Sequence, residues 1–257
     1  VSRADELALV GRDPEKLATA ARELASGTRS ARISTHRADL SLLADVRRLA
    51  GELADSTPSA NVLVNNAGAL FSHREVTSEG IERTFALNVL SPFLLTRLLH
   101  DRLRQNAPAR VVMVASAAHV GNKLHLDDLE GRAKYSGYAA YGRSKLALIL
   151  LTHEFARRWK PDGISVNAVH PGFVRSGFGH NNGGGTSAAI RFLALFALSA
   201  TKGATTPVYV ATSPQVEGTT GEYFAKSRVL PSSPESYDEA IGRKLWDICS
   251  EKVGLPP

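Results

Sequence analysis

The stretch NVLVNNAG, residues 61–68, is a short apolar run that ends in small and polar residues. Runs of this kind recur along the chain between longer amphipathic segments. They predict strands at 6–11, 31–38, 61–68, 110–116, 163–172 and 221–224. Apolar strands that alternate with helices are typical of a parallel sheet covered on both faces. The sequence therefore predicts an α/β fold with a doubly wound parallel sheet.

The first helix is predicted from DPEKLATAARELA, residues 13–25. Asp13 can accept hydrogen bonds from the first free amides, and Pro14 suits the first helical position. Glu15 suits the positive end of the helix dipole. A helix that follows the strand at 6–11 so closely supports strand–helix alternation.

Small and polar residues follow the predicted strands. In open parallel sheets ligands bind beyond the carboxyl ends of the strands, and small residues there let a flat ligand approach the backbone. Each position is also compatible with an ordinary turn. Their recurrence at one edge favours a ligand site made of Gly11, Arg12, Asp39, Leu40, Asn66, Ala67, Gly68, Ser116, Pro171 and Gly172.

Composition excludes several classes of protein. The 257 residues are 43% hydrophobic, which suits one domain over 1–257. The single Cys249 rules out an intramolecular disulfide framework and fits a reducing compartment. Basic residues are scattered despite the net charge of +6, so no nucleic-acid partner is expected. No apolar run reaches membrane-spanning length, and the run at 192–200 is too short.

Two further kinds of site lack support in the sequence. The histidines have no carboxylate or cysteine at metal-ligand spacing, so no metal site is predicted. Ser116 lies outside any G-x-S-x-G sequence, which argues against a serine hydrolase.

The segment YSGYAAYGRSK, residues 135–145, contains three tyrosines and a lysine. Tyr141 and Lys145 are four residues apart, so on a helix they share a face. An ammonium beside a phenol favours the phenolate and should lower the pKa of Tyr141. Such a spacing also arises by chance, and a helical tyrosine is often a packing residue. Among the three tyrosines, Tyr141 is the candidate acid/base.

These pieces, taken in order, resemble the short-chain dehydrogenase/reductase family over nearly the whole chain. The matching segments are ADL (38–40), NNAG (65–68), FALNVLSPFLL (85–95), VVMVASAAH (111–119), YGRSK (141–145) and VHPGFV (169–174). The interval from Ser116 to Tyr141 and the segment TSPQVEGTTGEYF (212–224) look most like the retinol-dehydrogenase-like branch. The resemblance implies a Rossmann-like fold and a carbonyl reductase or alcohol dehydrogenase.

The resemblance also implies a catalytic tetrad of Asn88, Ser116, Tyr141 and Lys145. Tyr141 would exchange a proton with the substrate oxygen, which Ser116 would hold. Lys145 would bind the nicotinamide ribose and lower the Tyr141 pKa. Asn88 would anchor a water through a local break in its helix.

The implied cofactor site favours NADP(H) over NAD(H). Gly11 leaves space where an acidic residue would repel a 2′-phosphate, and Arg12 offers a charged, forked donor. A surface role for Arg12 is the alternative. Asp39 would reach the adenine amine, and the backbone of 66–68 would pass beside the adenosine ribose. The remaining implied cofactor contacts are Leu40, Tyr141, Lys145, Pro171, Gly172 and Val174.

The chain departs from the family at its start. The family opens with a strand and a glycine-rich turn of the type G-x-x-x-G-x-G, whereas this sequence begins VSRADELALVGRD. The absent strand would lie between those at 6–11 and 61–68. Because neighbouring strands are about 4.8 Å apart, their facing edges should be about 10 Å apart and unpaired. We expect that the chain lacks an N-terminal segment.

The expected function is NADP(H)-dependent interconversion of a carbonyl and an alcohol on a lipophilic small molecule. A non-catalytic nucleotide-binding sensor and an inactive truncated product are the alternatives. The resemblance also suggests a homodimer formed through helices at 78–103 and 138–160. A cytoplasmic location is the default expectation, because any N-terminal signal would precede the sequence.

Overall fold

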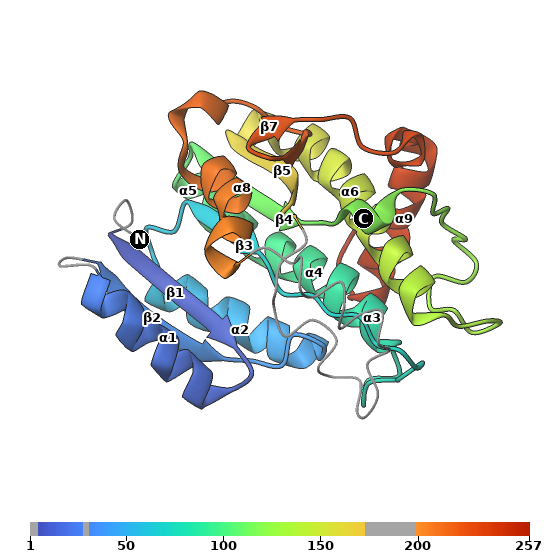
Figure 1. The fold of residues 1–257 in the computed structure, drawn as a ribbon, viewed down its shortest axis with the longest axis horizontal. Coiled ribbons are helices and arrows are strands. Elements are labelled where there is room, and N and C mark those ends of the chain that lie inside the picture. Colours follow the sequence, from blue (N-terminus) through green and yellow to red (C-terminus); the bar gives the residue numbers. More distant parts are fainter. Residues whose placement is uncertain (1–4, 28–30, 173–198) are drawn as a thin grey trace.

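A computed structural model of the chain describes residues 5–27, 31–172 and 199–257 (Figure 1). Its strands are β1 (Glu6–Gly11), β2 (Arg32–Arg37), β3 (Val62–Asn65), β4 (Ala109–Val114), β5 (Ile164–His170), β6 (Tyr223–Ala225) and β7 (Arg228–Val229). All six predicted strands are confirmed, with bounds that differ by at most three residues. The short strand β7 was not predicted, and it pairs antiparallel with β6.

The helices alternate with the strands as predicted. They are α1 (Pro14–Gly27), α2 (Leu43–Ser56), α3 (Arg83–Phe85), α4 (Ser91–Leu98), α5 (His100–Gln105), α6 (Gly137–Trp159), α8 (Ala200–Thr212) and α9 (Glu239–Lys252). A π-helical turn, η1 (Ala86–Leu90), joins α3 to α4. Short 3₁₀ turns are η2 (Ala117–His119), η3 (Lys160–Asp162), η4 (Pro214–Val216) and η5 (Pro234–Tyr237).

The start of α1 confirms the predicted cap. Asp13 Oδ1 accepts hydrogen bonds from the amides of Glu15 at 3.0 Å and Lys16 at 3.2 Å. These bonds lower the pKa of the Asp13 carboxyl, the one from Lys16 most strongly. Pro14 is the first residue of the helix, where a missing amide hydrogen costs no hydrogen bond.

The strands of the described residues form two sheets. One has the order β1-β2, and the other has the order β3-β4-β5-β6-β7. All neighbours except β6 and β7 run parallel. The strands β1 and β3 are not hydrogen-bonded to each other, which agrees with the expected break between 6–11 and 61–68.

The larger sheet has a core on each face. On one side α2, α4, α6 and α9 enclose a large cluster that includes Leu49, Phe93 and Phe155. On the other side α8 covers Val112, Val114 and Val169. The strands β4 and β5 are therefore covered on both faces, which explains why the sequence of β4 is a nearly continuous hydrophobic run.

The C-terminal helix α9 lies beside α6 on the right of Figure 1. Its Trp246 ring contacts Phe93 on α4 at 5.0 Å and Phe155 on α6 at 4.7 Å between centroids. The expected pairing of two copies through 78–103 and 138–160 stays a prediction. In this chain α9 packs against part of both segments.

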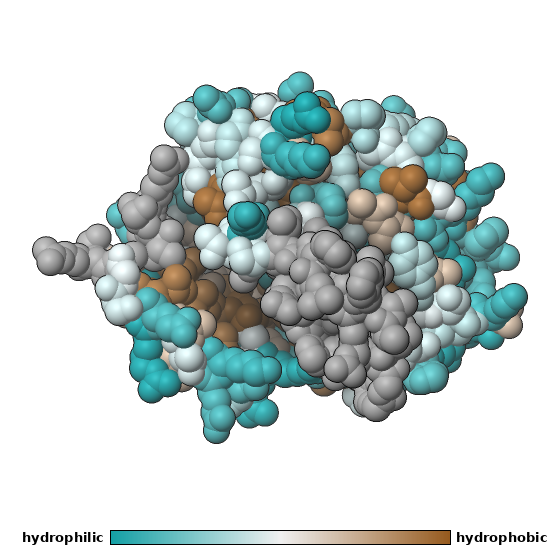
Figure 2. Space-filling view, in the orientation of Figure 1, coloured by the Kyte–Doolittle hydropathy of each residue, from teal (hydrophilic) through white to brown (hydrophobic). Residues whose placement is uncertain are grey.

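An apolar hollow opens between the β1–β2 unit and the remainder of the molecule, at the lower left of Figure 2. Val62 and Val64 of β3 are 39% and 41% exposed. Such exposure is unusual for a strand in the middle of an α/β protein. Among the described residues, no helix combines the length and apolar character that crossing a bilayer requires.

Candidate active site

Tyr141 lies one turn inside the N-terminal end of α6 and is 9% exposed. Burial raises the pKa of its phenol, a hydrogen bond with Ser116 opposes the rise, and the neighbouring Tyr138 adds to it. The expectation that Lys145 lowers this pKa is wrong, because the pKa of the phenol lies above its usual value. The phenol keeps its proton at neutral pH.

Lys145 lies beside Tyr141, as the four-residue spacing predicts. Its Nζ is 5.6 Å from the centroid of the Tyr141 ring and donates to the Val114 carbonyl at 2.8 Å. The side chain is 3% exposed, and burial lowers its pKa to about 8. An ammonium has three hydrogens to donate. Besides its bond to the Val114 carbonyl, the ammonium can therefore donate to further oxygen acceptors at this edge of the sheet.

Ser116 follows β4 and caps the 3₁₀ turn η2. Its Oγ accepts a hydrogen bond from the Ala118 amide at 3.2 Å. The hydroxyl hydrogen is therefore available to an acceptor near the Tyr141 phenol. Strand β4 and helix α6 thus bring Ser116 and Tyr141 together, although they are far apart in sequence.

Asn88 is fully buried in the π-helical turn η1. Its Nδ2 donates to the Ala69 carbonyl and to Ser144 Oγ, both at 2.9 Å, and its Oδ1 accepts from the Ala69 amide at 3.0 Å. The local break expected in the helix is present, and π-helical turns are frequent at functional sites. The amide of Asn88 holds backbone and a hydroxyl in this structure. Its role in anchoring a water stays a prediction.

The loop after β3 passes close to Lys145. Asn66, Ala67 and Gly68 are exposed. A Cβ atom on Gly68 would lie 3.0 Å from Lys145 Nζ and 3.2 Å from Asn88 Oδ1. Glycine therefore allows the loop backbone to run directly over these two side chains.

Two predicted cofactor positions follow β5. Pro171 and Gly172 are half-buried, and Gly172 has a φ of 86°, in the left-handed region that favours glycine. Val174, predicted to contact the cofactor, lies outside the described residues.

The second group of predicted residues lies at the ends of β1 and β2. Gly11 pairs with Arg37 across the two strands, and Arg12 is exposed beyond them. Burial opposes the charge of Asp39, but hydrogen bonds from Ser41 and the charges of Arg12 and Arg83 outweigh it and lower the pKa of its carboxyl. Leu40 is half-buried beside Asp39. Arg12 and Asp39 therefore lie close enough to interact electrostatically.

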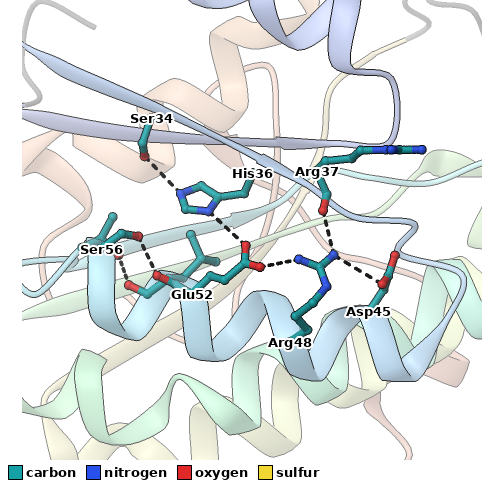
Figure 3. Close-up of polar contacts among 9 residues, drawn as sticks. Ser34, His36, Arg37, Asp45, Arg48, Glu52 and Ser56 are labelled. Carbon is teal, nitrogen blue, oxygen red and sulfur yellow. Dashed lines mark hydrogen bonds and ion pairs between the residues drawn. The ribbon is translucent and has the colours of Figure 1, made fainter.

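A polar network on α2 supports this end of the site (Figure 3). The Asp39 amide donates to Asp45 Oδ2 at 2.8 Å. Arg48 pairs with Asp45 at 3.3 Å and with Glu52, and it donates to the Arg37 carbonyl at 2.8 Å. The half-buried His36 contacts Glu52 at 3.4 Å. The side chains of α2 thus hold the carboxyl end of β2 in place.

The residues at the two groups fit different parts of a dinucleotide. The buried ammonium of Lys145, with a glycine backbone directly over it, suits a ribose diol beside Tyr141. Arg12 and Asp39 suit the adenosine end. The turn from β1 to α1 contains one glycine, Gly11, and the described residues form no glycine-rich turn of the type with which the family opens. The described residues contain no cluster of three side chains that could hold a metal ion.

Several residues that shape the site were not predicted. Ser144, between Tyr141 and Lys145, links Asn88 to α6 and donates to the Tyr141 carbonyl at 2.7 Å. Glu79 accepts from the first amides of α2, Leu43 at 2.6 Å and Ala44 at 2.9 Å. Ser144 directly precedes Lys145 in the sequence, and this position could have indicated that it belongs to the site. Glu79 is remote in sequence from α2, and no sequence pattern indicates that it contacts this helix.

Comparison with known proteins gives a consistent result. The family model described as short chain dehydrogenase matches residues 2–184. Retinol dehydrogenase 13 of Mus musculus is 35% identical over 259 residues, which cover 98% of this chain and 78% of that protein. "Putative daunorubicin C-13 ketoreductase DnrU" of Streptomyces sp. (strain C5) is 41% identical, over 96% of this chain and 83% of that protein.

A protein of Mycobacterium paratuberculosis with a known crystal structure has the same fold. It superposes with a TM-score of 0.73 at 26% sequence identity, over 99% of this chain and 95% of that one. Sequence and structure comparisons therefore agree over nearly the full length of the described chain.

Proposed function

Because the chain belongs to the short-chain dehydrogenase family, as an oxidoreductase of its retinol-dehydrogenase-like branch, we propose that it interconverts a carbonyl and an alcohol on a lipophilic small molecule, with NADP(H) as hydride carrier and Tyr141 as general acid/base. The observation that supports this most directly is the buried group at the edge of β4. There, Tyr141 is hydrogen-bonded to Ser116 and has the Lys145 ammonium beside its ring.

The protonation state of Tyr141 suits the donation of a proton. Because burial raises the pKa of the phenol, it carries a proton at neutral pH and can transfer it to a carbonyl oxygen being reduced. The reverse reaction returns the proton to the phenolate, whose charge the Lys145 ammonium would stabilise. The nicotinamide, when bound, accepts or supplies the hydride.

Ser116 is placed to orient the substrate oxygen. Its Oγ already accepts from the Ala118 amide, so its hydrogen is directed elsewhere, toward Tyr141 or an oxygen that replaces that contact. A second donor on the same oxygen stabilises negative charge that develops there. Asn88, through Ala69 and Ser144, fixes the loop and the helix between which the reactants would lie.

The preference for NADP(H) rests on the ends of β1 and β2. Gly11 has no side chain to occupy the space, and the exposed guanidinium of Arg12 can bind a phosphate through two hydrogen bonds. Asp39 lies on the same side, so the 2′-phosphate would have to approach Arg12 away from that carboxylate.

The proposal of a lipophilic substrate rests on apolar surface beside the site. Tyr138, one turn before Tyr141 on α6, is 67% exposed, and Val120 after η2 is 63% exposed. Large exposed apolar side chains next to a reactive group favour an apolar ligand. The names of two relatives, a retinol dehydrogenase and a daunorubicin ketoreductase, agree with this choice.

The test is Tyr141→Phe, with Tyr209→Phe as a matched control. Tyr209 lies on α8, and its hydroxyl bonds to Gln215 at 3.2 Å. On a carbonyl substrate that the wild type reduces with NADPH, Tyr141→Phe should lose about 10²–10⁴-fold in kcat and retain cofactor binding. Equal rates for wild type and Tyr141→Phe would remove Tyr141 from the mechanism.

Two alternatives make different predictions. A nucleotide-binding sensor would bind NADPH, with no turnover for Tyr141→Phe to abolish. An inactive truncated product would show no saturable binding of NADPH in a fluorescence titration of the 257-residue chain. Binding together with turnover supports the oxidoreductase.

A further inference from the structure

The peptide group that follows Ser116 is held by two histidines that are not part of the predicted tetrad. His119 Nδ1 lies 2.6 Å from the Ser116 carbonyl oxygen. His170 Nδ1 accepts a longer hydrogen bond from the Ala117 amide at 3.4 Å. That carbonyl and that amide belong to the same peptide unit. Rotation of this unit would change the direction of the serine side chain.

The partners of His119 define its tautomer. A carbonyl oxygen can only accept a hydrogen bond, so Nδ1 of His119 carries the hydrogen. The amide of Ser233 donates to Nε2 at 3.0 Å, so Nε2 carries a lone pair. His119 is therefore a neutral imidazole protonated on Nδ1. Protonation of Nε2 would place two hydrogens against each other and break the bond to Ser233.

The ring of His119 is also fixed by packing. It is 1% exposed and meets the Tyr223 ring edge-on, with centroids 5.1 Å apart. Burial lowers the pKa of His119, opposed by its bond to Ser116 and by the charge of Glu235. The charged or titratable groups near it are Tyr223 on β6, Glu235 on η5 and His170 on β5. Residues of several elements thus restrict the rotation of the His119 ring.

Ser233 belongs to a compact C-terminal turn. Ser236 Oγ donates to the Ser233 carbonyl at 2.6 Å and lies 2.6 Å from Ser232 Oγ. The His119 ring therefore connects the loop after β4 to a turn far along the sequence. Both nitrogens of the buried ring are thereby satisfied, and one of the two bonds is to the Ser116 peptide.

We propose that His119 is a positioning residue that, together with His170, fixes the Ser116–Ala117 peptide and so aims the Ser116 hydroxyl at the substrate oxygen. This role rests on the proposed function, because Ser116 has an oxygen to orient only if the chain reduces a carbonyl or oxidises an alcohol. It adds to the tetrad a neutral histidine that acts through Ser116.

The kinetic test compares His119→Phe, His119→Gln and His100→Phe. Phenylalanine keeps a ring against Tyr223 and loses both hydrogen bonds, whereas glutamine can donate and accept at once. His100 is a matched control, because its ring lies 4.5 Å from Trp159 and bonds to Asp162 at 2.9 Å, both away from the site. His119→Phe should lower kcat by about 10–100-fold with the Kd for NADPH nearly unchanged. His119→Gln should recover part of the loss.

A spectroscopic arm requires no turnover. Nitrogen-15 spectra of the wild-type chain at neutral pH should show His119 with a hydrogen on Nδ1 and none on Nε2. The opposite tautomer, or a doubly protonated ring, would overturn the hydrogen-bond assignment. A kcat for His119→Phe equal to that of His100→Phe would overturn the positioning role of His119. A wild type inactive toward all carbonyl substrates would count against the proposed function and leave the tautomer assignment standing.

Discussion

The side-chain amide of Asn88 lies 2.9 Å from Ser144 Oγ, one residue before Lys145. The same amide binds both backbone groups of Ala69 in the loop after β3. One buried side chain thus ties the loop after β3 to the helix that bears Tyr141. The two halves of the site cannot move apart without breaking these bonds.

Asn88→Ala should destabilise the chain more than Ser144→Ala. The first change leaves the buried amide and carbonyl of Ala69 without their partner and should cost about 2–4 kcal/mol, whereas the second removes one hydroxyl and should cost about 1 kcal/mol. Urea unfolding followed by circular dichroism measures both. If Asn88→Ala lowered the free energy of unfolding no more than Ser144→Ala, the proposed role of Asn88 in joining the loop after β3 to α6 would be contradicted.

Gly142→Ala should disturb the site through packing alone. A Cβ atom there would lie 2.5 Å from Asn122 Nδ2 and 2.7 Å from the Ala118 carbonyl, so α6 would be pushed from the loop that holds Ser116. We expect lower stability and lower kcat. The matched control is Gly51→Ala on α2, where a Cβ meets nothing within 4 Å. It should stabilise the chain by about 0.5–1 kcal/mol, and equal effects of the two changes would be inconsistent with the close approach.

Lys145→Met should abolish turnover and raise stability at pH 7. Burial lowers the Lys145 pKa to about 8, so below that pH the fold carries a charge that it disfavours. Removing the charge should stabilise the folded chain by about 1–3 kcal/mol. Loss of the hydrogen bond to the Val114 carbonyl should offset part of this gain. The wild type should gain stability as the pH rises past about 8, because the folded chain loses this proton before the unfolded chain does. A variant less stable than the wild type at pH 7 would refute this assignment.

Acidification should destabilise the wild type through its buried and half-buried histidines. Burial lowers the pKa values of His119, His153 and His170, so the fold favours their neutral forms. Unfolded histidine takes up a proton near pH about 6.5, so the stability should fall as the pH drops through and below that value. His153→Phe removes one of these groups and should reduce the fall. Urea midpoints between about pH 7.5 and 5 test this, and a midpoint that rose on acidification would oppose it.

Arg12→Ala should weaken NADPH binding by about 10-fold or more and leave NADH nearly unchanged, because only NADPH carries a 2′-phosphate for the guanidinium. The control is Arg32→Ala, at the opposite end of the β1–β2 pair, where the exposed Arg32 forms an ion pair with Glu6 at 3.6 Å. Fluorescence titration with both cofactors gives the ratio. Equal weakening of NADPH and NADH would place the 2′-phosphate elsewhere.

Local patterns predicted what depends on neighbours in sequence. The Asp13 cap, the strands and the helical spacing of Tyr141 and Lys145 were of this kind. Burial of the two side chains depends on packing with β4 and on the surroundings of α6, so the direction of the Tyr141 pKa could not be read from the spacing.

Contacts between residues that are far apart in the sequence could not be predicted from local sequence patterns. Glu130 is 6% exposed and pairs with Lys252 on α9 at 2.8 Å. Neither residue stands in a motif, and more than a hundred positions separate them. The two bonds of His119 are similar, because Ser233 lies on a turn that no local signal connects to β4.

The separation of β1 and β2 from the larger sheet bears on how the molecule opens in solution. None of the residues of β1 or α1 is fully buried, and β1 has hydrogen bonds only to β2 among the described strands. Amide hydrogens there should exchange through a local opening well before those of β4 and β5. Arg12 and Asp39 belong to this same unit. Bound nucleotide should slow the amide exchange of the β1–β2 unit. The lifetime of its closed state would then depend on the ligand, because no hydrogen bonds between the described strands join this unit to the larger sheet.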